Sequence, residues 1–375
     1  MNFLDISNQI TSTILQYSNI LLYIKGSPDP DVIASSFALN IICDELGVKS
    51  KIVASLGTSL PQNKAVVNGL NIPIHFEKNI HGISNFDAYC IVDHPSAYVE
   101  GLSENCRCAI HIDHHEPIEE KVEVDVKFVT DKAGSVSTIM ALILKELNLI
   151  SNETLKKKIA TALLYGVQTD TNDFQHATHL DYEALNYLSH YSDRKIIHKI
   201  TDLPLSKQAN ELIDTAIKNQ IIYKDWLITG VGLLNETLRD NIAIIADLLL
   251  SRESIKTSVV FAIIEKKSLK SLTLDVSLRT TDENLNLNEF IKNITKEGGA
   301  RKFKGAYQVP LDYFSNCPDK GLLWNLSQAT TIEVIKKQID IIPFIELKNM
   351  FNNFKEKVGV FFGKKLTKKK QRGLH

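Results

Sequence analysis

The sequence predicts an α/β protein in which a mostly parallel sheet, flanked by helices, is followed by a second, smaller α/β domain with a mixed sheet. In the first half of the chain, short apolar runs alternate with amphipathic stretches, a pattern typical of βαβ units with right-handed crossovers. In the second half the pattern changes, and apolar runs indicate neighbouring strands with helices packed on them. The length of 375 residues, with 44% hydrophobic and 23% charged residues, is sufficient for two domains with separate cores.

The predicted strands of the first domain are short apolar runs, and helix-like stretches lie between them. Gly47 is expected to end the first helix, because glycine readily occupies the position after a helix C-terminus. Strands are expected at residues 19–24, 51–54, 88–92 and 108–112, with an edge strand at 127–129, and helices at residues 31–46, 135–147 and 153–165.

The predicted second domain begins after a polar, partly helical connection. Its strands are expected at residues 225–231, 257–264 and 271–278, and its helices at residues 237–250, 287–295 and 330–340. The expected boundaries are 1–190 for the first domain, 191–205 for the linker, 206–345 for the second domain and 346–375 for a basic, mobile tail.

Composition and termini restrict the class of protein. The net charge of −1 argues against a polycation built for nucleic acid, although lysines concentrate after residue 355 and make the tail basic. Five cysteines, an odd number, argue against the disulfide framework of a secreted protein. The N-terminus lacks the basic region of a signal peptide, and no uncharged apolar run reaches the roughly 18 residues of a membrane span. We therefore expect a soluble cytoplasmic protein without a membrane partner.

Acidic and histidine residues follow the predicted strands and one helix. Asp29 and Asp31 lie in the loop after the first strand, Asp93 ends the third strand, and Asp170 follows an apolar helix. The tripeptide Asp113-His114-His115 follows the fourth strand. Because open α/β sheets place their chemistry at the carboxyl ends of strands, these groups indicate a site for a divalent metal.

Taken alone, each of these residues also has a purely structural interpretation. Asp31 can cap the helix that begins there, Asp93 can be a turn residue, and Asp170 can be an exposed aspartate in a turn. Residues 134–138 open a helix whose amides can bind a phosphate, and helix capping explains that segment equally well. The functional interpretation therefore depends on the occurrence of these residues together.

In order and spacing, the motifs resemble the DHH phosphoesterase superfamily over about residues 15–185. The shared pattern is a strand–loop Asp-x-Asp, a strand-end Asp, a strand-end Asp-His-His and a helix-end Thr-Asp-Thr. The stretch at residues 297–306 is similar to the glycine-rich motif of the DHH-associated C-terminal domain. Together the two parts resemble the two-domain subgroup that contains oligoribonucleases, adenosine-bisphosphate phosphatases, cyclic-dinucleotide phosphodiesterases and exopolyphosphatase-like proteins.

The resemblance implies a two-metal site, usually with manganese and alternatively with magnesium, that activates a water for in-line attack on phosphorus. Asp93 would bridge both ions, and Asp29 would belong to the second one. His115 would face the substrate phosphate, while Asp113 would orient the neighbouring imidazole. The implied metal ligands are Asp29, Asp31, Asp93, His114 and Asp170, and the implied catalytic residues are Asp93, Asp113, His114 and His115.

Two positions depart from the family pattern. Lys25 stands where many relatives have a metal-binding histidine, so it leaves one ion short of a ligand, neutralises the carboxylates or holds a phosphate as a point charge. Ala300 and Arg301 replace the last two residues of a Gly-Gly-Gly-His motif, and arginine offers a planar fork for phosphate oxygens. The basic stretch is either a solvated turn or a phosphate cradle of the second domain, formed by Gly298, Gly299, Arg301, Lys302 and Lys304.

The predicted function is metal-dependent hydrolysis of phosphodiester or phosphomonoester bonds in short oligonucleotides or nucleotide phosphates. One alternative is hydrolysis of phosphoanhydrides such as polyphosphate or pyrophosphate. Another is a nucleotide- or nucleic-acid-binding relative whose catalysis is weakened because Lys25 replaces a histidine ligand. The basic tail is a candidate contact for nucleic acid, and a homodimer is compatible with the prediction.

Overall fold

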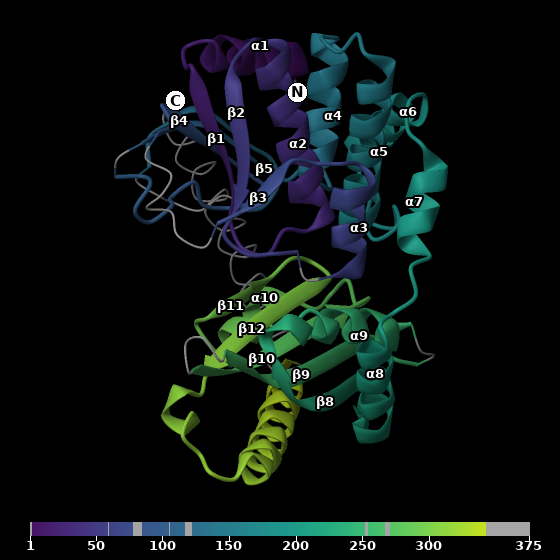
Figure 1. Ribbon diagram of the computed structural model, residues 1–375. Coiled ribbons are helices and arrows are strands. Elements are labelled where there is room, and N and C mark those ends of the chain that lie inside the picture. The colour runs from purple at the N-terminus through teal and green to yellow at the C-terminus, as the bar shows by residue number, and fades with distance from the viewer. Residues whose placement is uncertain are drawn as a thin grey trace, which may run out of the picture. The chain divides into compact units, whose positions relative to one another are not determined.

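The structure is a computed structural model in which residues 2–58, 60–77, 85–104, 106–116, 122–251, 254–266 and 271–342 are described. The chain divides into two compact units, Met1–Pro204 and Leu205–His375 (Figure 1). The basic tail expected at residues 346–375 lies outside the described residues. None of the described helices combines the length and the hydrophobicity that a bilayer crossing requires.

The first unit contains a six-stranded sheet whose strands pair in parallel. The strand order is β3-β2-β1-β4-β5-β6, so the direction in which the sheet grows reverses between β1 and β4. Such a reversal opens a crevice at the carboxyl ends of the two strands, where doubly wound sheets bind their ligands. The strands are β1 (Asn19–Ile24), β2 (Lys49–Ala54), β3 (Ile74–Phe76), β4 (Ala88–Val92), β5 (Arg107–Asp113) and β6 (Val124–Val129).

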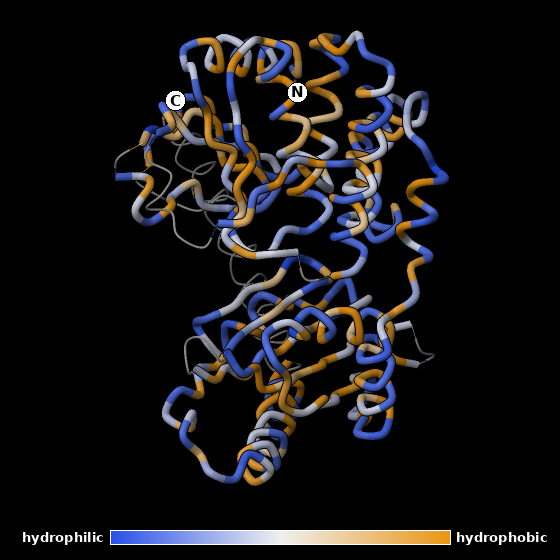
Figure 2. Tube along the Cα trace, viewed as in Figure 1, coloured by the Kyte–Doolittle hydropathy of each residue, from blue (hydrophilic) through white to orange (hydrophobic). Residues whose placement is uncertain are grey.

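The central strands of this sheet are buried on both faces. Every residue of β4 and all but the first residue of β1 are buried, as expected of a parallel sheet that is covered on both sides. On one face, the hydroxyl of Tyr89 donates to the Ala97 carbonyl oxygen at 3.0 Å within a small apolar cluster. The other face packs against helices, and hydrophobic residues, orange in Figure 2, concentrate in these strands and helices.

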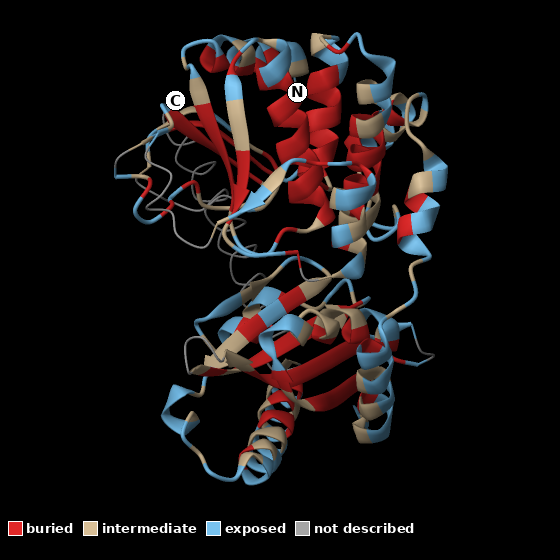
Figure 3. Cartoon of the chain, viewed as in Figure 1, coloured by how far each residue is buried: buried red, intermediate tan, exposed pale blue. Residues whose placement is uncertain are grey.

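Helices α2, α4 and α5 pack side by side (Figure 1). Helix α2 is buried from Pro30 to Cys43, which is typical of a helix enclosed by other elements (Figure 3). Gly166 in α5 allows a close approach, because a Cβ atom there would lie 2.2 Å from Ser137 Oγ and 3.2 Å from Asp31 Cα. The helices of this unit are α1 (Phe3–Ile14), α2 (Pro30–Glu45), α3 (Pro61–Gly69), α4 (Val136–Leu147), α5 (Glu153–Asp170), α6 (His179–Ser189) and α7 (Arg194–Thr201).

The second unit contains a mixed sheet of order β11-β12-β10-β9-β8-β7, in which β8 and β9 are parallel and the other described pairs antiparallel. One face carries an apolar core shared with α8 and α9, and the other face a core shared with α10 and a helix over residues 320–342. The elements are α8 (Lys207–Asn219), β7 (Ile221–Tyr223), β8 (Trp226–Asn235), α9 (Asn241–Leu250), β9 (Thr257–Lys266), β10 (Ser271–Thr280), α10 (Leu287–Lys292), β11 (Gly298–Ala300) and β12 (Lys304–Pro310), with 3-10 turns at Glu236–Leu238 and Asp312–Phe314.

The prediction of an α/β protein with a parallel and a mixed sheet is confirmed, and β1 and β4 have the predicted bounds. Helix α5 continues to Asp170 instead of ending near residue 165, because Gly166 serves close packing inside the helix rather than ending it. The glycine-rich stretch forms a hairpin, in which β11 and β12 flank the basic turn. The sequence analysis did not predict helices α1, α3, α6 and α8, nor the strands β3, β7, β11 and β12.

Candidate metal centre

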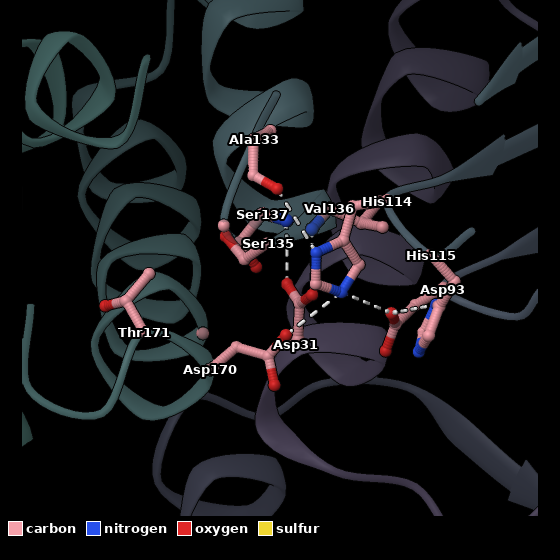
Figure 4. Close-up of polar contacts among 12 residues, drawn as sticks. Asp31, Asp93, His114, His115, Ala133, Ser135, Val136, Ser137, Asp170 and Thr171 are labelled. Atoms are coloured by element: carbon pink, nitrogen blue, oxygen red, sulfur yellow. Dashed lines mark hydrogen bonds and ion pairs between the residues drawn. The ribbon is translucent and has the colours of Figure 1, made fainter. Parts of the chain in front are cut away.

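Candidate ligands from several segments meet at the carboxyl ends of three adjacent strands. Asp29 and Asp31 follow β1, Asp93 follows β4, and the Asp113-His114-His115 tripeptide spans the end of β5. Asp170, the last residue of α5, approaches the same place from the helical layer (Figure 4). The site thus occupies the crevice that the reversed strand order creates.

Asp31 is held by the N-terminus of α4. The residue is 1% exposed, and its two carboxylate oxygens accept hydrogen bonds from the amides of Val136 at 2.8 Å and Ser137 at 2.7 Å. These amides belong to the first turn of a helix, which has no internal acceptors for them, and the helix dipole favours a negative charge there. The carboxylate is therefore fixed through both of its oxygens.

Asp93 has a left-handed backbone conformation, with φ of 56°. Aspartate and asparagine tolerate this conformation better than most other residues with a side chain. Its amide donates to the Ile112 carbonyl oxygen at 3.0 Å, so the pairing of β4 with β5 continues to this residue. The side chain is 5% exposed and lies next to His114 and His115 (Figure 4).

His114 lies between a backbone carbonyl and two carboxylates. Its Nδ1 is 3.3 Å from the Ala133 carbonyl oxygen, which fixes the ring and leaves Nε2 as the atom that faces the carboxylates. Nε2 is 3.0 Å from Asp170 Oδ2 and 3.4 Å from Asp93 Oδ1 (Figure 4). Both His114 Nε2 and Asp93 Oδ1 are buried, and neither forms a hydrogen bond of normal geometry within the described residues. Buried polar atoms that face one another in this way are suitable ligands for a shared metal ion.

His115 is oriented by the carboxylate of Asp113. Its Nδ1 is 2.6 Å from Asp113 Oδ1, and its ring lies edge-on to that of His114 with 4.8 Å between centroids. Burial alone would raise the pKa of Asp113, but the hydrogen bond and charge of His115 outweigh it and lower that pKa. The Asp113 carboxylate is therefore ionised at neutral pH and fixes His115 through Nδ1.

The cluster concentrates negative charge in a buried place. Burial raises the pKa of Asp31, and the neighbouring carboxylate of Asp170 raises it further. Burial, Asp31 and Asp29 raise the pKa of Asp93 well above its usual range. Burial alone would lower the pKa of His114, but the carboxylates of Asp170 and Asp93 raise it well above the ordinary value. A cation at this place would relieve the repulsion between the carboxylates.

In the described part of the chain, two groups of side chains have ligand atoms within 4.8 Å of one another, so that each could hold a metal ion. One group contains Asp93, His114 and His115, and the other contains Asp31, His114 and Asp170. Carboxylate oxygen and imidazole nitrogen are a donor set for manganese, magnesium or another divalent ion of similar hardness. The buried atoms without hydrogen bonds and the donor set both fit such an ion.

Comparison with known proteins assigns the first unit to a family. Residues 19–167 match the family described as DHH family, N-terminal domain. Residues 19–167 therefore form a DHH domain. The uncharacterized protein MJ1633 of Methanocaldococcus jannaschii is 32% identical to this chain over 326 residues, which cover 84% of this chain and 64% of that protein. This chain thus spans less than two thirds of the length of that relative.

A solved structure extends the likeness beyond the DHH domain. The crystal structure of an exopolyphosphatase-related protein from Bacteroides fragilis aligns with a TM-score of 0.70 and 15% identity. The alignment covers 91% of this chain and 98% of that structure. At this identity the likeness shows a common fold.

Two predicted site residues of the DHH domain have structural contacts of their own. Lys25, directly after β1, donates from Nζ to the carbonyl oxygens of Ser96 at 3.1 Å and Tyr98 at 2.7 Å, so its ammonium anchors the loop after Asp93. Asp29 caps α2 by accepting from the Val32 amide at 3.0 Å, and among the described residues it belongs to neither group of ligand atoms.

The remaining predicted site residues lie in the second unit. Gly298 and Gly299 form β11, and the Arg301 amide donates to the Lys304 carbonyl oxygen at 2.8 Å across the turn. Arg301 and Lys302 are exposed, and the Lys302 ammonium lies 3.8 Å from a carboxylate oxygen of Glu283. These residues therefore form a compact basic turn at the tip of a hairpin.

The sequence analysis missed the backbone groups that hold the ligands. The amides of residues 136 and 137, which it assigned either to phosphate binding or to helix capping, donate to Asp31. It also missed the carbonyl of Ala133 beside His114, and the contact of 2.8 Å between His111 Nε2 and the His94 carbonyl oxygen. The N-cap signal of Ser135 located the helix start, but no local pattern indicates what its amides bind.

Proposed function

We propose that this DHH protein is a metal-dependent phosphoesterase that uses manganese or magnesium. The observation that carries the proposal is the pair of buried atoms His114 Nε2 and Asp93 Oδ1, which lie 3.4 Å apart without hydrogen bonds in the described part of the chain. Asp170 Oδ2 lies 3.0 Å from the same His114 Nε2, so ligand atoms of three side chains converge on one place. A cation bound there would relieve the repulsion between the carboxylates. The match of residues 19–167 to the DHH family supports a phosphorus-containing substrate.

The side chains divide between two ions in our proposal. His114 offers a single ligand atom, Nε2, because Nδ1 faces the Ala133 carbonyl. We assign Asp31, His114 and Asp170 to one ion, Asp93 to both, and Asp29 to the second. When bound, the divalent ions supply Lewis acidity and lower the pKa of a water that attacks phosphorus.

His115 and Asp113 serve the substrate in this proposal. Asp113 holds His115 through Nδ1 at 2.6 Å, which leaves Nε2 to donate a hydrogen bond to a phosphate oxygen. A donor in this place stabilises the negative charge that develops on the transferring phosphoryl group. Because the carboxylate of Asp113 is buried, it holds the ring in one orientation before the substrate arrives.

The substrate class that we propose is a short oligonucleotide or a nucleotide phosphate. The basic turn of the second unit provides exposed Arg301 and Lys302 near the start of β12, which suits phosphate groups. We assign Gly298, Gly299, Arg301, Lys302 and Lys304 to substrate binding, together with Lys25. We further predict that the basic tail binds nucleic acid. We also predict that the protein forms a homodimer.

A second candidate function is hydrolysis of phosphoanhydrides. The structurally similar Bacteroides fragilis protein is described as exopolyphosphatase-related, and both reactions use the same attack on phosphorus. A third candidate is a nucleotide- or nucleic-acid-binding relative with weakened catalysis, because Lys25, which donates to backbone carbonyls, stands where the family pattern has a histidine ligand.

Turnover measurements separate these functions. The full chain is incubated with Mn²⁺ and a dinucleotide, adenosine bisphosphate, a cyclic dinucleotide or polyphosphate, with and without a chelator. We expect chelator-sensitive hydrolysis of a nucleotide substrate, and a decrease of about 1000-fold or more in kcat/KM for Asp93→Ala, equivalent to several kcal/mol of lost transition-state stabilisation. Glu146→Ala removes an exposed carboxylate of α4 and should leave the rate unchanged. Full activity of Asp93→Ala, or no turnover of any substrate, would contradict the proposal.

A further inference from the structure

Asp181, in the first turn of α6, is a buried carboxylate outside the candidate metal centre. It has no exposed surface, and it is surrounded by hydrogen-bond donors from two segments. The Gly134 amide lies 3.0 and 3.1 Å from its two oxygens, Thr138 Oγ1 donates at 2.5 Å, and the Thr178 amide donates at 2.6 Å. Two of these donors belong to the start of α4, so Asp181 ties α6 to that helix.

The residues at the start of α4, 133–138, are here called the α4 entry segment. Four of its amides donate to side chains: Gly134 to Asp181, Val136 and Ser137 to Asp31, and Thr138 to the Ser135 hydroxyl at 3.0 Å. Two buried carboxylates, those of Asp31 and Asp181, therefore accept hydrogen bonds from the segment. Asp31 is a candidate metal ligand, and Asp181 is not.

The α4 entry segment also contacts a second candidate ligand. The Ala133 carbonyl oxygen lies 3.3 Å from His114 Nδ1 and so fixes which nitrogen faces the carboxylates. The same segment leaves no free space beside Asp181: a Cβ atom on Gly134 would lie 2.5 Å from Asp181 Oδ2 and 2.7 Å from Thr171 Cγ2. Thr171 follows Asp170 directly in the chain. A shift of this segment would therefore displace Asp31 and His114 together.

We propose that Asp181 is a positioning residue for the metal centre: it fixes the α4 entry segment, which in turn holds Asp31 and His114 in ligating positions. This inference rests on the proposed metal centre. Loss of a group that orients a metal ligand through a hydrogen bond typically lowers the metal affinity by about 10- to 100-fold. Since Asp181 acts through the backbone of the segment, we expect an effect at the lower end, about 10-fold.

A purely structural role would have a different signature. Asp181 also accepts from the Thr178 amide at the start of α6, so its loss removes a helix cap and lowers the melting temperature. A cap affects the stability of the folded chain but not the geometry of the ligands. Metal affinity, measured well below the melting temperature, distinguishes the two roles.

The test is calorimetric titration of the metal-free full chain with MnCl₂, together with its melting temperature. Asp181→Ala and Thr138→Val should each weaken Mn²⁺ binding by about 10-fold. Thr138→Val keeps the cap of α6, because Asp181 can still accept from Thr178, and it decides the question if Asp181→Ala does not fold. Thr138→Ser retains the hydroxyl and should bind Mn²⁺ as the wild type does.

A matched control is Glu183→Ala. Glu183 also connects α6 to α4, through an exposed ion pair with Lys145 at 2.8 Å, and among the described residues its side chain hydrogen-bonds to Lys145 and not to the α4 entry segment. Its Mn²⁺ affinity should equal that of the wild type. Unchanged affinity in a folded Asp181→Ala or Thr138→Val protein would overturn the positioning role while leaving the metal centre intact. Absence of Mn²⁺ and Mg²⁺ binding by the wild type would instead overturn the metal centre, and the positioning role with it.

Discussion

The cluster of candidate metal ligands in the first unit and the glycine-rich hairpin of the second unit are built in opposite ways. In the cluster, Asp31 is buried, the His114 side chain is 6% exposed, and each is held by backbone groups of the α4 entry segment. In the hairpin, Arg301 and Lys302 project from an exposed turn between two short strands. The cluster is preorganised by packing, so it should be disrupted by changes of shape. The hairpin should be sensitive mainly to changes of charge.

The largest expected effect of shape is that of Gly166→Ala. The new methyl group would lie 2.2 Å from Ser137 Oγ and 3.2 Å from Asp31 Cα, so α5 must move away from the start of α4. Overpacking of this kind typically costs about 1–3 kcal/mol of unfolding free energy. We expect chemical denaturation to show a loss of about 2 kcal/mol, accompanied by weaker Mn²⁺ binding.

Gly69→Ala is the control for Gly166→Ala. Gly69 is the last residue of α3, and a Cβ atom there would meet nothing within 4 Å. The substitution should leave the stability unchanged or raise it by up to about 1 kcal/mol, because alanine restricts the unfolded chain. Equal effects of the two substitutions would show that the packing around Asp31 is not tight.

The hairpin should respond to the loss of one charge without a loss of stability. Arg301→Ala removes an exposed side chain, so the free energy of unfolding should change by no more than about 0.5 kcal/mol. Since a charge-assisted hydrogen bond to phosphate contributes roughly 1.5–3 kcal/mol, kcat/KM for a nucleotide substrate should decrease by about 10-fold or more. Steady-state kinetics should place this change mainly in KM.

Lys207→Ala removes an equally positive, exposed side chain from α8 of the same unit and is the control for net charge. Its kcat/KM should match that of the wild type. If both variants lose activity equally, the basic turn acts through the overall charge of the unit and not by contact with the substrate.

The smallest expected effect is a pH dependence that belongs to the cluster alone. The pKa of His114 is raised in the folded state by Asp170 and Asp93, against the effect of burial. Its contribution to stability is therefore complete below the unfolded value of about 6.5 and is lost as the pH rises through the raised folded value. The raised pKa values of Asp31 and Asp93 act in the same direction.

Metal-free protein should consequently be less stable at pH 8.5 than at pH 6.5, by about 1 kcal/mol in urea denaturation. Added Mn²⁺ should reverse the trend, since protons compete with the cation for the same ligands. His114→Gln should remove most of the pH dependence, whereas substitution of His190, which is exposed directly after α6, should not. A metal-free protein that gains stability between pH 6.5 and 8.5 would contradict the described charge balance.

The strand ends could be predicted from the sequence, because apolar runs lead directly into Asp93 and into the Asp113-His114-His115 tripeptide. Parallel pairing then brings those ends together without any further information. The parts of the site that lie on strands are therefore encoded locally.

The hydrogen bonds and helix packing that hold the candidate ligands in place could not be predicted in the same way. Asp181 lies 47 residues from Gly134, and the Asp31 carboxylate accepts from an amide 105 residues away. Buried hydrogen bonds of this kind depend on how helices pack, and a single aspartate in a helix has no pattern that indicates its partner. The same holds for Gly166, whose role becomes visible only when α2, α4 and α5 are brought together.

The left-handed backbone at Asp93 has a consequence for how this protein can evolve. Its φ of 56° favours aspartate, asparagine and glycine over other residues. Asparagine and glycine can each be reached from aspartate by a single-base change in the codon, and both remove the negative charge while keeping the turn. Under the proposed function, the mutations that the backbone tolerates best would also remove a shared metal ligand. A single-base change could then give a folded but inactive descendant, because the backbone conformation at Asp93 does not by itself select for the carboxylate.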